Sequence, residues 1–297
     1  MPRAVLSQTT VNYAKLGPWD SSASPIVLVH GLAASCAFWL RAAEHLSRTH
    51  PVLLFDLLGH GRSSVSRDGY TPMRLGEDLA ELLDFFALDR VVLVGHSFGG
   101  SVALHTTLHC PDRMEQVVVV DTRLRVFQPK LTPAAWSQWS ERGQRLRELG
   151  FTIDENEPEG GIRLLTEMAR AEIHSTNCEK LPIWVHEFFG QRQSRFTAAR
   201  WLELVENTSL LEDVKHEESL TVETLKKLAV PILGIYGENS PVATSGRLLK
   251  EARPETKIQI VAGAGHFFPA TRPAEFVETL LNFLPESPPI IRPMKAS

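Results

Sequence analysis

The chain has 297 residues, of which 43% are hydrophobic and 22% are charged, and its formal net charge is −4. These values are typical of a folded globular protein and exclude disorder over most of the length. Acidic and basic residues are spread along the chain, so no basic block indicates a partner such as nucleic acid or a membrane surface. The length suits one large domain with room for a sizeable insertion.

Three cysteines, Cys36, Cys110 and Cys178, lie far apart and form no CxxC pair. An odd number without a secretory context argues against a disulfide framework and favours a reducing compartment. No apolar run reaches the roughly 18 residues that a membrane-spanning helix needs. Met1–Asn12 is polar, unlike a signal peptide. We therefore expect a cytoplasmic protein without membrane insertion, as a monomer or a homodimer.

Short apolar runs rich in β-branched residues recur along the chain and indicate strands. A run that is apolar throughout is typical of a parallel strand covered by helices on both faces. Six runs have this character: Ile26–Val29, Val52–Phe55, Val91–Val94, Val117–Val120, Ile232–Tyr236 and Ile258–Val261. Thr9–Lys15 adds antiparallel strand character near the start.

Helical patterns separate these strands. Between the second and third runs, leucines from Leu75 to Leu83 follow one stripe, and we expect Glu77, Asp78 and Glu81 to face away from it. Strands that alternate with helices in this way predict an α/β fold built on a doubly wound, mostly parallel sheet.

The alternation stops after Asp121 and resumes near Pro231. The segment between has no convincing strand but carries four helical patterns: Ala134–Leu149, Ile162–Ile173, Phe196–Glu206 and Ser219–Leu228. Such an insertion would cover the carboxyl edge of the sheet, where these folds bind ligands. The expected division is a core of residues 1–121 and 229–284, a helical cap of residues 122–228, and an irregular, proline-rich tail of residues 285–297.

The third apolar run leads into a G-x-S-x-G motif, Gly95-His96-Ser97-Phe98-Gly99, and then into a helical pattern, Ser101–His109. Between a strand and a helix this motif is typical of a nucleophile elbow, a sharp turn that exposes its serine at the sheet edge. Glycines flank the serine because side chains there would collide with the adjoining strand or helix. An ordinary turn with Ser97 as the helix N-cap is the alternative. We favour Ser97 as the nucleophile, because further features follow in the right order.

A serine nucleophile needs a neutral imidazole within hydrogen-bond reach. His266 is the best candidate among eleven histidines, because its glycine-rich loop lies just after the last apolar run and before the helical pattern Pro273–Phe283. It also follows the nucleophile in the chain, as in hydrolases with this elbow. We expect the side chain of His96, inside the elbow, to turn away from the cavity.

Four motifs in this order give the chain a resemblance to the α/β-hydrolase fold superfamily, and among its members to capped serine esterases and thioesterases. They are Val29-His30-Gly31-Leu32, Asp56-Leu57-Leu58-Gly59-His60-Gly61-Arg62-Ser63, the Gly95–Gly100 elbow and Gly263-Ala264-Gly265-His266. The resemblance implies eight strands in the order 1-2-4-3-5-6-7-8, with the cap after strand 6. It also implies an oxyanion hole formed by the N–H groups of Leu32 and Phe98, and loop-holding roles for His30 and His60.

The acid that orients the histidine is not where the resembled family usually has it. That family reads G-x-x-D after strand 7, whereas this chain reads Gly237-Glu238-Asn239-Ser240, and a serine cannot stabilise an imidazolium as a carboxylate does. We favour Asp121, because some members place the acid after strand 6, which neighbours strands 5 and 7 about 4.8 Å away. Glu238 is the alternative, and another acid or none stays open. Asp56 follows strand 4, on the wrong side of the elbow.

These residues predict an acyl-enzyme route in which Ser97 attacks a carbonyl carbon and His266 transfers the proton. Members of the family that hydrolyse epoxides or haloalkanes carry aspartate at the elbow, so Ser97 argues against both reactions. The sequence has no HExxH, no Cys/His cluster and no GxGxxG. We expect neither a metal nor a cofactor.

Aromatic residues are concentrated in the insertion and indicate a mainly apolar pocket. Trp136, Trp139 and Phe189 are candidates for substrate contact, although aromatic residues at helical spacing also build cores. We expect a small-molecule carboxylic ester or lactone as the substrate. A thioesterase or acyl-transferring hydrolase that releases a polyketide or acyl chain is the alternative. A ligand-binding receptor or scaffold with little turnover is the alternative of another class.

Three cationic residues, Arg123, Arg125 and Lys130, follow Asp121 closely. They are candidates for contacting an anionic group of the substrate, although a solvated entry to the cap explains them as well. Hydrolysis of a carbon–carbon bond in a diketone by the same serine–histidine pair also stays open.

Overall fold

The computed structural model describes residues 2–131, 143–145, 147–148, 150, 159–174, 189, 194–217 and 219–284. Its strands are β1 (Arg3–Val5), β2 (Thr10–Leu16), β3 (Ile26–Val29), β4 (Val52–Phe55), β5 (Val91–His96), β6 (Met114–Val120), β7 (Ile232–Gly237) and β8 (Lys257–Val261). They form one sheet in the order β1-β2-β4-β3-β5-β6-β7-β8. β2 pairs antiparallel with both β1 and β4, and the other five pairs are parallel, which confirms the predicted fold class.

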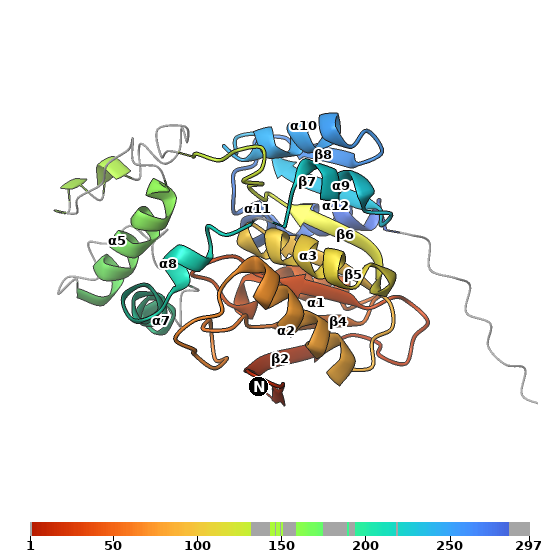
Figure 1. Ribbon diagram of the computed structural model, residues 1–297, viewed down its shortest axis with the longest axis horizontal. Helices are drawn as coiled ribbons and strands as arrows, with labels where there is room; N and C mark the ends of the chain where they lie inside the picture. Colours follow the sequence, from red (N-terminus) through yellow and green to blue (C-terminus); the bar gives the residue numbers. More distant parts are fainter. Residues whose placement is uncertain are drawn as a thin grey trace, which may run out of the picture.

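The main helices that flank the sheet are α1 (Leu40–Leu46), α2 (Pro72–Phe85), α3 (Phe98–His109), α10 (Ala243–Ala252) and α12 (Pro273–Leu281). Shorter elements are η1 (Cys36–Trp39), η2 (Pro111–Arg113), α9 (Val222–Lys227) and α11 (Phe268–Thr271). Figure 1 shows the sheet running through the molecule with helices on both of its faces.

Strict alternation of side chains divides the core into two layers. Along β5, Val91 and Leu93 belong to one apolar cluster, which also holds the buried leucines of α2 and α10. Val92 and Val94 belong to the other, which holds the buried face of α1 and α12. Successive residues of a strand point to opposite faces, so a strand covered on both sides must be apolar at every position. This requirement explains the continuous apolar runs.

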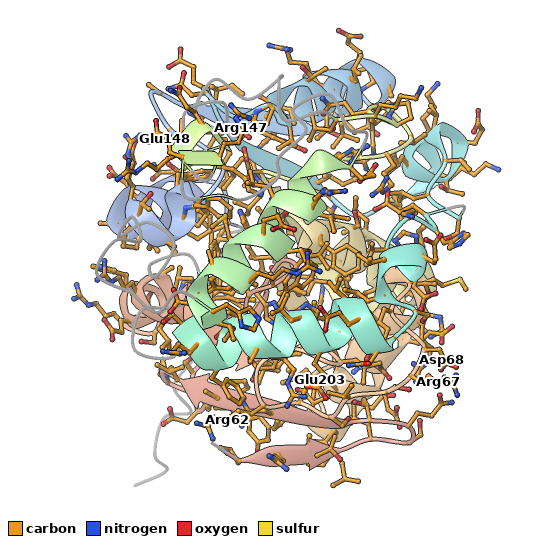
Figure 2. All side chains as sticks on the ribbon, turned by 90° about the vertical axis from the view of Figure 1, so that its left-hand side faces the viewer. Arg62, Arg67, Asp68, Arg147, Glu148 and Glu203 are labelled. Atoms are coloured by element: carbon orange, nitrogen blue, oxygen red, sulfur yellow. The ribbon has the colours of Figure 1, made fainter. Side chains whose placement is uncertain are left out.

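Between β6 and β7 the described helices are α5 (Gly160–His174), α7 (Ser194–Asn207) and α8 (Leu210–Asp213), followed by α9. α5 and α7 pack against each other, and in Figure 2 they cross in front of the sheet, with Glu203 labelled on α7. The indole N–H of Trp201 donates to Thr166 Oγ1 (3.2 Å) between the two helices. The helical pattern expected at Ala134–Leu149 lies mostly outside the described residues.

Two details differ from the sequence-based expectation. Asp78 does not face away: it is 6% exposed and pairs with Arg74 (Nη1–Oδ1 2.8 Å) on the preceding turn of α2. Burial raises the pKa of Asp78 to about 6. Arg3–Val5 forms β1, although its three residues are too few to show a recognisable alternation. Within the described residues, none of the helices is long and apolar enough to cross a membrane.

Parallel strands end at a common edge, and this edge gathers the candidate residues. Ser97 follows β5, Asp121 follows β6, Gly237 ends β7, and His266 lies in the loop after β8. β5, β6, β7 and β8 are consecutive neighbours in the sheet, so segments far apart in the sequence end side by side.

Candidate active site

Ser97 occupies a strained turn between β5 and α3, with φ 54° and ψ −123°. A positive φ is costly for a residue with a side chain and persists only where the surroundings impose it. Here a Cβ on Gly95 would lie 2.2 Å from the Gly99 carbonyl oxygen, and one on Gly99 would lie 2.5 Å from the His30 carbonyl oxygen. Only glycines allow this approach, and the turn presents Ser97 to a cavity.

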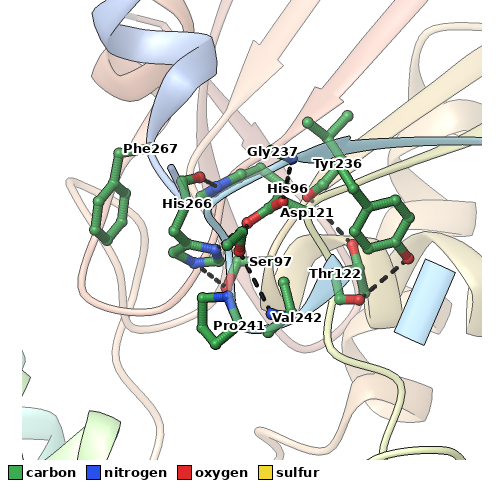
Figure 3. Close-up of polar contacts among 12 residues, drawn as sticks. His96, Ser97, Asp121, Thr122, Tyr236, Gly237, Pro241, Val242, His266 and Phe267 are labelled. Atoms are coloured by element: carbon green, nitrogen blue, oxygen red, sulfur yellow. Dashed lines mark hydrogen bonds and ion pairs between the residues drawn. The ribbon is translucent and has the colours of Figure 1, made fainter. Parts of the chain in front are cut away.

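His266 lies between Ser97 and Asp121 and contacts both. Its Nε2 is 3.1 Å from Ser97 Oγ, and its Nδ1 is 2.6 Å from Asp121 Oδ2 (Figure 3). Because Asp121 is a carboxylate, Nδ1–H is the donor in that bond, which leaves the Nε2 lone pair directed at the serine hydroxyl. The structure thus brings together the three residues expected to act as nucleophile, base and acid.

Asp121 is fully buried, and its carboxylate is held by three donors. Oδ1 accepts from the Gly237 N–H (2.8 Å), and Oδ2 accepts from the Ser240 hydroxyl (2.5 Å) as well as from His266. A buried carboxylate is costly unless it is paired and hydrogen-bonded, and these donors meet that need. Burial and the nearby charge of Asp121 raise the pKa of Tyr236.

Ser240 therefore belongs to the site, although the sequence did not predict this. It stands where the resembled family usually carries the acid, and its hydroxyl donates to Asp121, which follows the neighbouring strand β6. The alternative acid, Glu238, lies elsewhere: it is exposed, and its Oε2 accepts from the Gly263 N–H (2.8 Å). Asp56 binds the N–H groups of Cys36 and Arg62 and the side chain of Asn12.

The loop after β3 packs directly against the elbow. A Cβ on Gly31 would lie 3.1 Å from Ser97 Cβ, so the His30–Leu32 turn and the serine are in van der Waals contact. Leu32 and Phe98 both line the cavity beside Ser97. Within the described part of the chain, neither of their backbone N–H groups donates a hydrogen bond. This arrangement leaves both available to an oxygen atom bound at Ser97.

His96, which precedes Ser97 in the elbow, is 1% exposed. It lines the cavity, its Nε2–H donates to the His266 carbonyl (2.9 Å), and its ring stacks on Phe38 with centroids 4.5 Å apart. The His96 and His266 rings are 4.8 Å apart. Burial, and then the neighbouring His266, hold the pKa of His96 well below its ordinary value, so the ring is neutral.

His30 and His60 lie outside the hydrogen-bond chain from Ser97 to Asp121. His30 Nδ1–H donates to the Gly31 carbonyl (2.8 Å), while its Nε2 accepts from the Leu57 N–H (3.1 Å). This neutral ring ties the loop after β3 to the loop after β4, and burial lowers its pKa. His60 Nδ1–H donates to the Leu58 carbonyl (3.0 Å), and burial lowers its pKa to about 3.

The cavity above Ser97 and His266 has a volume of about 230 Å³. Its described lining is mainly apolar, from Phe38, Phe98, Ile162, Leu165, Val242 and Phe267, and a polar wall holds Arg123, Arg125, Glu159 and Glu217. Two of the aromatic residues proposed for substrate contact, Trp136 and Trp139, lie outside the described residues.

Phe189 is described and is 1% exposed. It packs in the main apolar cluster and is not among the described residues that line the cavity. Aromatic side chains bury a large apolar area, so they are readily used in the core. Among the described residues, no group of three or more His, Cys, Asp or Glu side chains is arranged to hold a metal ion.

The fold and this site define an α/β hydrolase. The chain belongs to the alpha/beta hydrolase family, whose model matches residues 26–279, from β3 into α12. It is 26% identical over 275 residues to 1-acylglycerol-3-phosphate O-acyltransferase ABHD5 of Rattus norvegicus, covering 86% of this chain and 76% of the relative.

Two further matches show how widely the fold is used. The chain is 25% identical over 291 residues to a haloalkane dehalogenase of Psychrobacter cryohalolentis, covering 95% of this chain and 89% of the relative. Among solved structures, the N-acyl homoserine lactone degrading enzyme Est816 superposes with a TM-score of 0.66 at 21% identity, over 95% of this chain and 100% of that one. These names differ in reaction, so the substrate must be argued from the site.

Proposed function

We propose that this protein is a serine hydrolase that cleaves carboxylic esters or lactones of small molecules. The observation that carries the proposal is the continuous hydrogen-bond chain from Ser97 Oγ through His266 to Asp121, with heavy-atom distances of 3.1 and 2.6 Å. A serine hydroxyl becomes a competent nucleophile only when an oriented, neutral imidazole can take its proton.

In the first half of the reaction, Ser97 Oγ attacks the carbonyl carbon of the ester while His266 Nε2 takes the hydroxyl proton. The N–H groups of Leu32 and Phe98 donate to the oxyanion, and the N-terminus of α3 adds favourable electrostatic potential. Asp121 stabilises the imidazolium through Nδ1–H. When the tetrahedral intermediate collapses, the proton on Nε2 passes to the leaving alkoxide, and the acyl group stays on Ser97.

In the second half, a water molecule attacks the acyl carbon and gives a proton to His266 Nε2. Collapse of the second tetrahedral intermediate breaks the bond to Ser97 Oγ, which recovers its proton from Nε2, and the carboxylic acid leaves. In a lactone, the alkoxide formed in the first half belongs to the same molecule as the acyl group, so the product is a hydroxy acid.

The serine also argues against the reaction named for the dehalogenase relative. Displacement of halide by a serine oxygen would leave an ether on Ser97, which has no carbonyl carbon for water to attack. An acyl group on serine is an ester and can be hydrolysed. The site is therefore suited to substrates that contain a carbonyl group.

We propose that residues 122–228 act as the cap over this site, because Ile162 and Leu165 of α5 and Val214 line the cavity that holds Ser97. The largely apolar lining favours an uncharged acyl or alcohol chain beside the catalytic residues. Acyl transfer, which the name of the rat relative mentions, would use the same acyl-enzyme with an alcohol in place of water.

A panel of p-nitrophenyl esters, lactones and acyl-thioesters tests the proposal, together with a fluorophosphonate probe. We expect ester turnover, stoichiometric labelling of Ser97, and loss of both in Ser97→Ala. Turnover of thioesters alone would favour the thioesterase alternative. A folded protein that neither turns over any member of the panel nor reacts with the probe would not be a serine hydrolase, and a ligand-binding role would take its place.

A further inference from the structure

The wall of the cavity that holds Ser97 and His266 has a charged stretch. Arg123, Arg125, Glu159 and Glu217 all line the cavity. The two arginines follow Asp121 and β6, Glu159 directly precedes α5, and Glu217 follows α8. Segments far apart in the sequence thus place two cations and two anions beside an otherwise apolar cavity.

The two arginines share a single carboxylate. Arg125 binds Glu159 with both terminal nitrogens (Nη1–Oε1 2.7 Å, Nη2–Oε2 2.8 Å), and Arg123 Nη1 binds the same Oε2 at 2.9 Å. The three side chains are 15 to 21% exposed. Glu217 Oε2 accepts the backbone N–H of Arg125 at 3.3 Å.

The arginines differ in how many of their donors are used. A guanidinium has five N–H donors. Arg123 also donates from Nε to the Gln128 carbonyl (2.8 Å) and from Nη2 to the Pro129 carbonyl (2.7 Å), so it is anchored on three sides. Among the described residues, the side-chain nitrogens of Arg125 donate only to Glu159, which leaves the Nε–H and the second hydrogens of the terminal nitrogens for a ligand.

The unused donors of Arg125 suit a further carboxylate. Burial lowers the pKa of Arg123, the hydrogen bond to Glu159 opposes this shift, and repulsion by Arg125 adds to it. A substrate carboxylate would accept the unused donors of Arg125 in a planar, bidentate geometry.

We propose that Arg125, backed by Arg123, binds a carboxylate that the substrate carries away from its scissile ester bond. This proposal rests on the proposed ester hydrolysis and names the substrate class. The apolar part of the cavity takes the connecting chain, and the arginine pair takes its charged end. Lys130, the third cation noted in the sequence, is exposed and is not among the described lining residues.

The test compares substrates that differ only in charge. One series carries the group on the acyl side: monoethyl glutarate, adipate and pimelate against the corresponding ethyl esters with a terminal carboxamide. The other carries it on the alcohol side: acetyl esters of ω-hydroxy acids against those of the matching ω-hydroxy amides. We expect the carboxylate to be preferred by about 10- to 100-fold in kcat/KM, mainly through KM, in one of the two series.

Two variants at the same ion pair should move this preference in opposite directions. Arg125→Gln removes the carboxylate-binding cation and should reduce the preference to about threefold or less, with turnover of the neutral esters retained. Glu159→Gln removes the competing anion and should raise the preference. If the ion pair only braces α5 against the segment after β6, both variants should harm charged and neutral esters alike. Lys257 begins β8, at the end of the strand away from the His266 loop. Lys257→Gln is the control for net charge and should change neither the carboxylate preference nor the turnover of the neutral esters.

Binding to Ser97→Ala separates this proposal from the proposed function. If no ester in either series is hydrolysed by the wild type, the hydrolase proposal fails. Calorimetry on Ser97→Ala then still measures whether monoethyl adipate binds more tightly than its carboxamide counterpart. Equal binding of the two, equal kcat/KM in both series, or a preference that Arg125→Gln leaves intact would each overturn the carboxylate site.

Discussion

Asp121 and Asp56 are two buried aspartates that follow parallel strands at the same edge of the sheet. Asp56 directly follows β4 and is 1% exposed. Asp121 directly follows β6 and is 0% exposed. Each accepts three hydrogen bonds. The donors to Asp56 are the N–H groups of Cys36 and Arg62 and the Asn12 amide, whereas those to Asp121 are the Gly237 N–H, the Ser240 hydroxyl and the His266 ring.

The difference between them lies in one donor. All three partners of Asp56 are amides, which do not act as acids or bases near neutral pH, so the contacts of this carboxylate fix the conformation of its loop. His266 can exchange a proton and contacts Ser97. A buried, fully hydrogen-bonded aspartate at the sheet edge is therefore no sign of catalysis by itself, and the identity of the partner decides its role.

Asp121→Asn should produce the largest difference in kcat between variants of the two aspartates. The Asn oxygen must stay opposite the fixed Gly237 N–H, which turns the amide NH₂ toward His266 Nδ1. The imidazole is then held in the tautomer that protonates Nε2 and cannot take the serine proton. We expect kcat to fall by about 10²- to 10⁴-fold, while the free energy of unfolding falls by only about 1 kcal/mol. Ester turnover and urea denaturation measure the two quantities.

Ser240 allows a rescue of the same variant. Its hydroxyl already contacts Asp121 Oδ2, so a carboxylate placed there lies near the imidazole. Ser240→Asp in the Asp121→Asn background should recover at least about tenfold of the lost kcat. Wild-type activity of Asp121→Asn, combined with a loss in Glu238→Gln, would assign the acid to Glu238 instead.

Asp56→Asn should give the converse result. An asparagine offers one acceptor oxygen to three N–H donors, so at least one buried donor loses its partner. We expect the free energy of unfolding to fall by about 2–4 kcal/mol, with kcat of the folded enzyme within about threefold of the wild type. Urea denaturation and turnover normalised by active-site titration check this. A loss of kcat as large as that of Asp121→Asn would remove the distinction between the two carboxylates.

The sequence predicted most of the fold, because its strongest signals are local. Continuous apolar runs located the six parallel strands to within a few residues, since strands buried on both faces cannot carry polar side chains. The position of β1 was not predicted, because three residues are too few to show an alternation, and the outward orientation of Asp78 was wrong, because its burial depends on how α2 packs.

The candidate site divides in the same way. The positions of Ser97 and His266 could be read from motifs, because a tight turn and a glycine-rich loop restrict which residues fit. The contact between Asp121 and His266 was one of several open possibilities, and the support from Ser240 was not foreseen. Which carboxylate reaches the imidazole depends on how β6, β7 and the loop after β8 meet, and no local pattern encodes this.

The loop near Asp56 should also make stability depend on pH. Burial, and then repulsion by His30, lower the pKa of His60 to about 3 in the folded protein, against about 6.5 in an unfolded chain. Below pH 6.5 the unfolded state therefore binds a proton that the folded state excludes, and stability is lost as the pH falls toward 3. From this ring alone we expect a loss of about 2 kcal/mol between pH 7.5 and 5.

Urea denaturation of His60→Asn across this pH range measures the contribution, because the variant should show a shallower loss of stability toward acid. Exposed His109 provides the control, and His109→Asn should keep the wild-type dependence. If His60→Asn and the wild type lose stability in parallel, the acid sensitivity arises elsewhere in the chain.

Ser240→Ala should give the smallest effect and the finest test of the comparison. The variant removes one of the three donors to Asp121 but leaves the Gly237 N–H and His266 in place, so the carboxylate is held less firmly. We expect kcat to fall by about 3- to 10-fold, in line with the loss of one hydrogen bond to a charged group. Ser63→Ala is the matched control at the other aspartate, because its buried hydroxyl donates to the Asp56 carbonyl. It should cost stability while leaving kcat near that of the wild type. If both variants lowered kcat equally, activity would track general loosening of the sheet edge, and Ser240 would have no particular part in orienting Asp121.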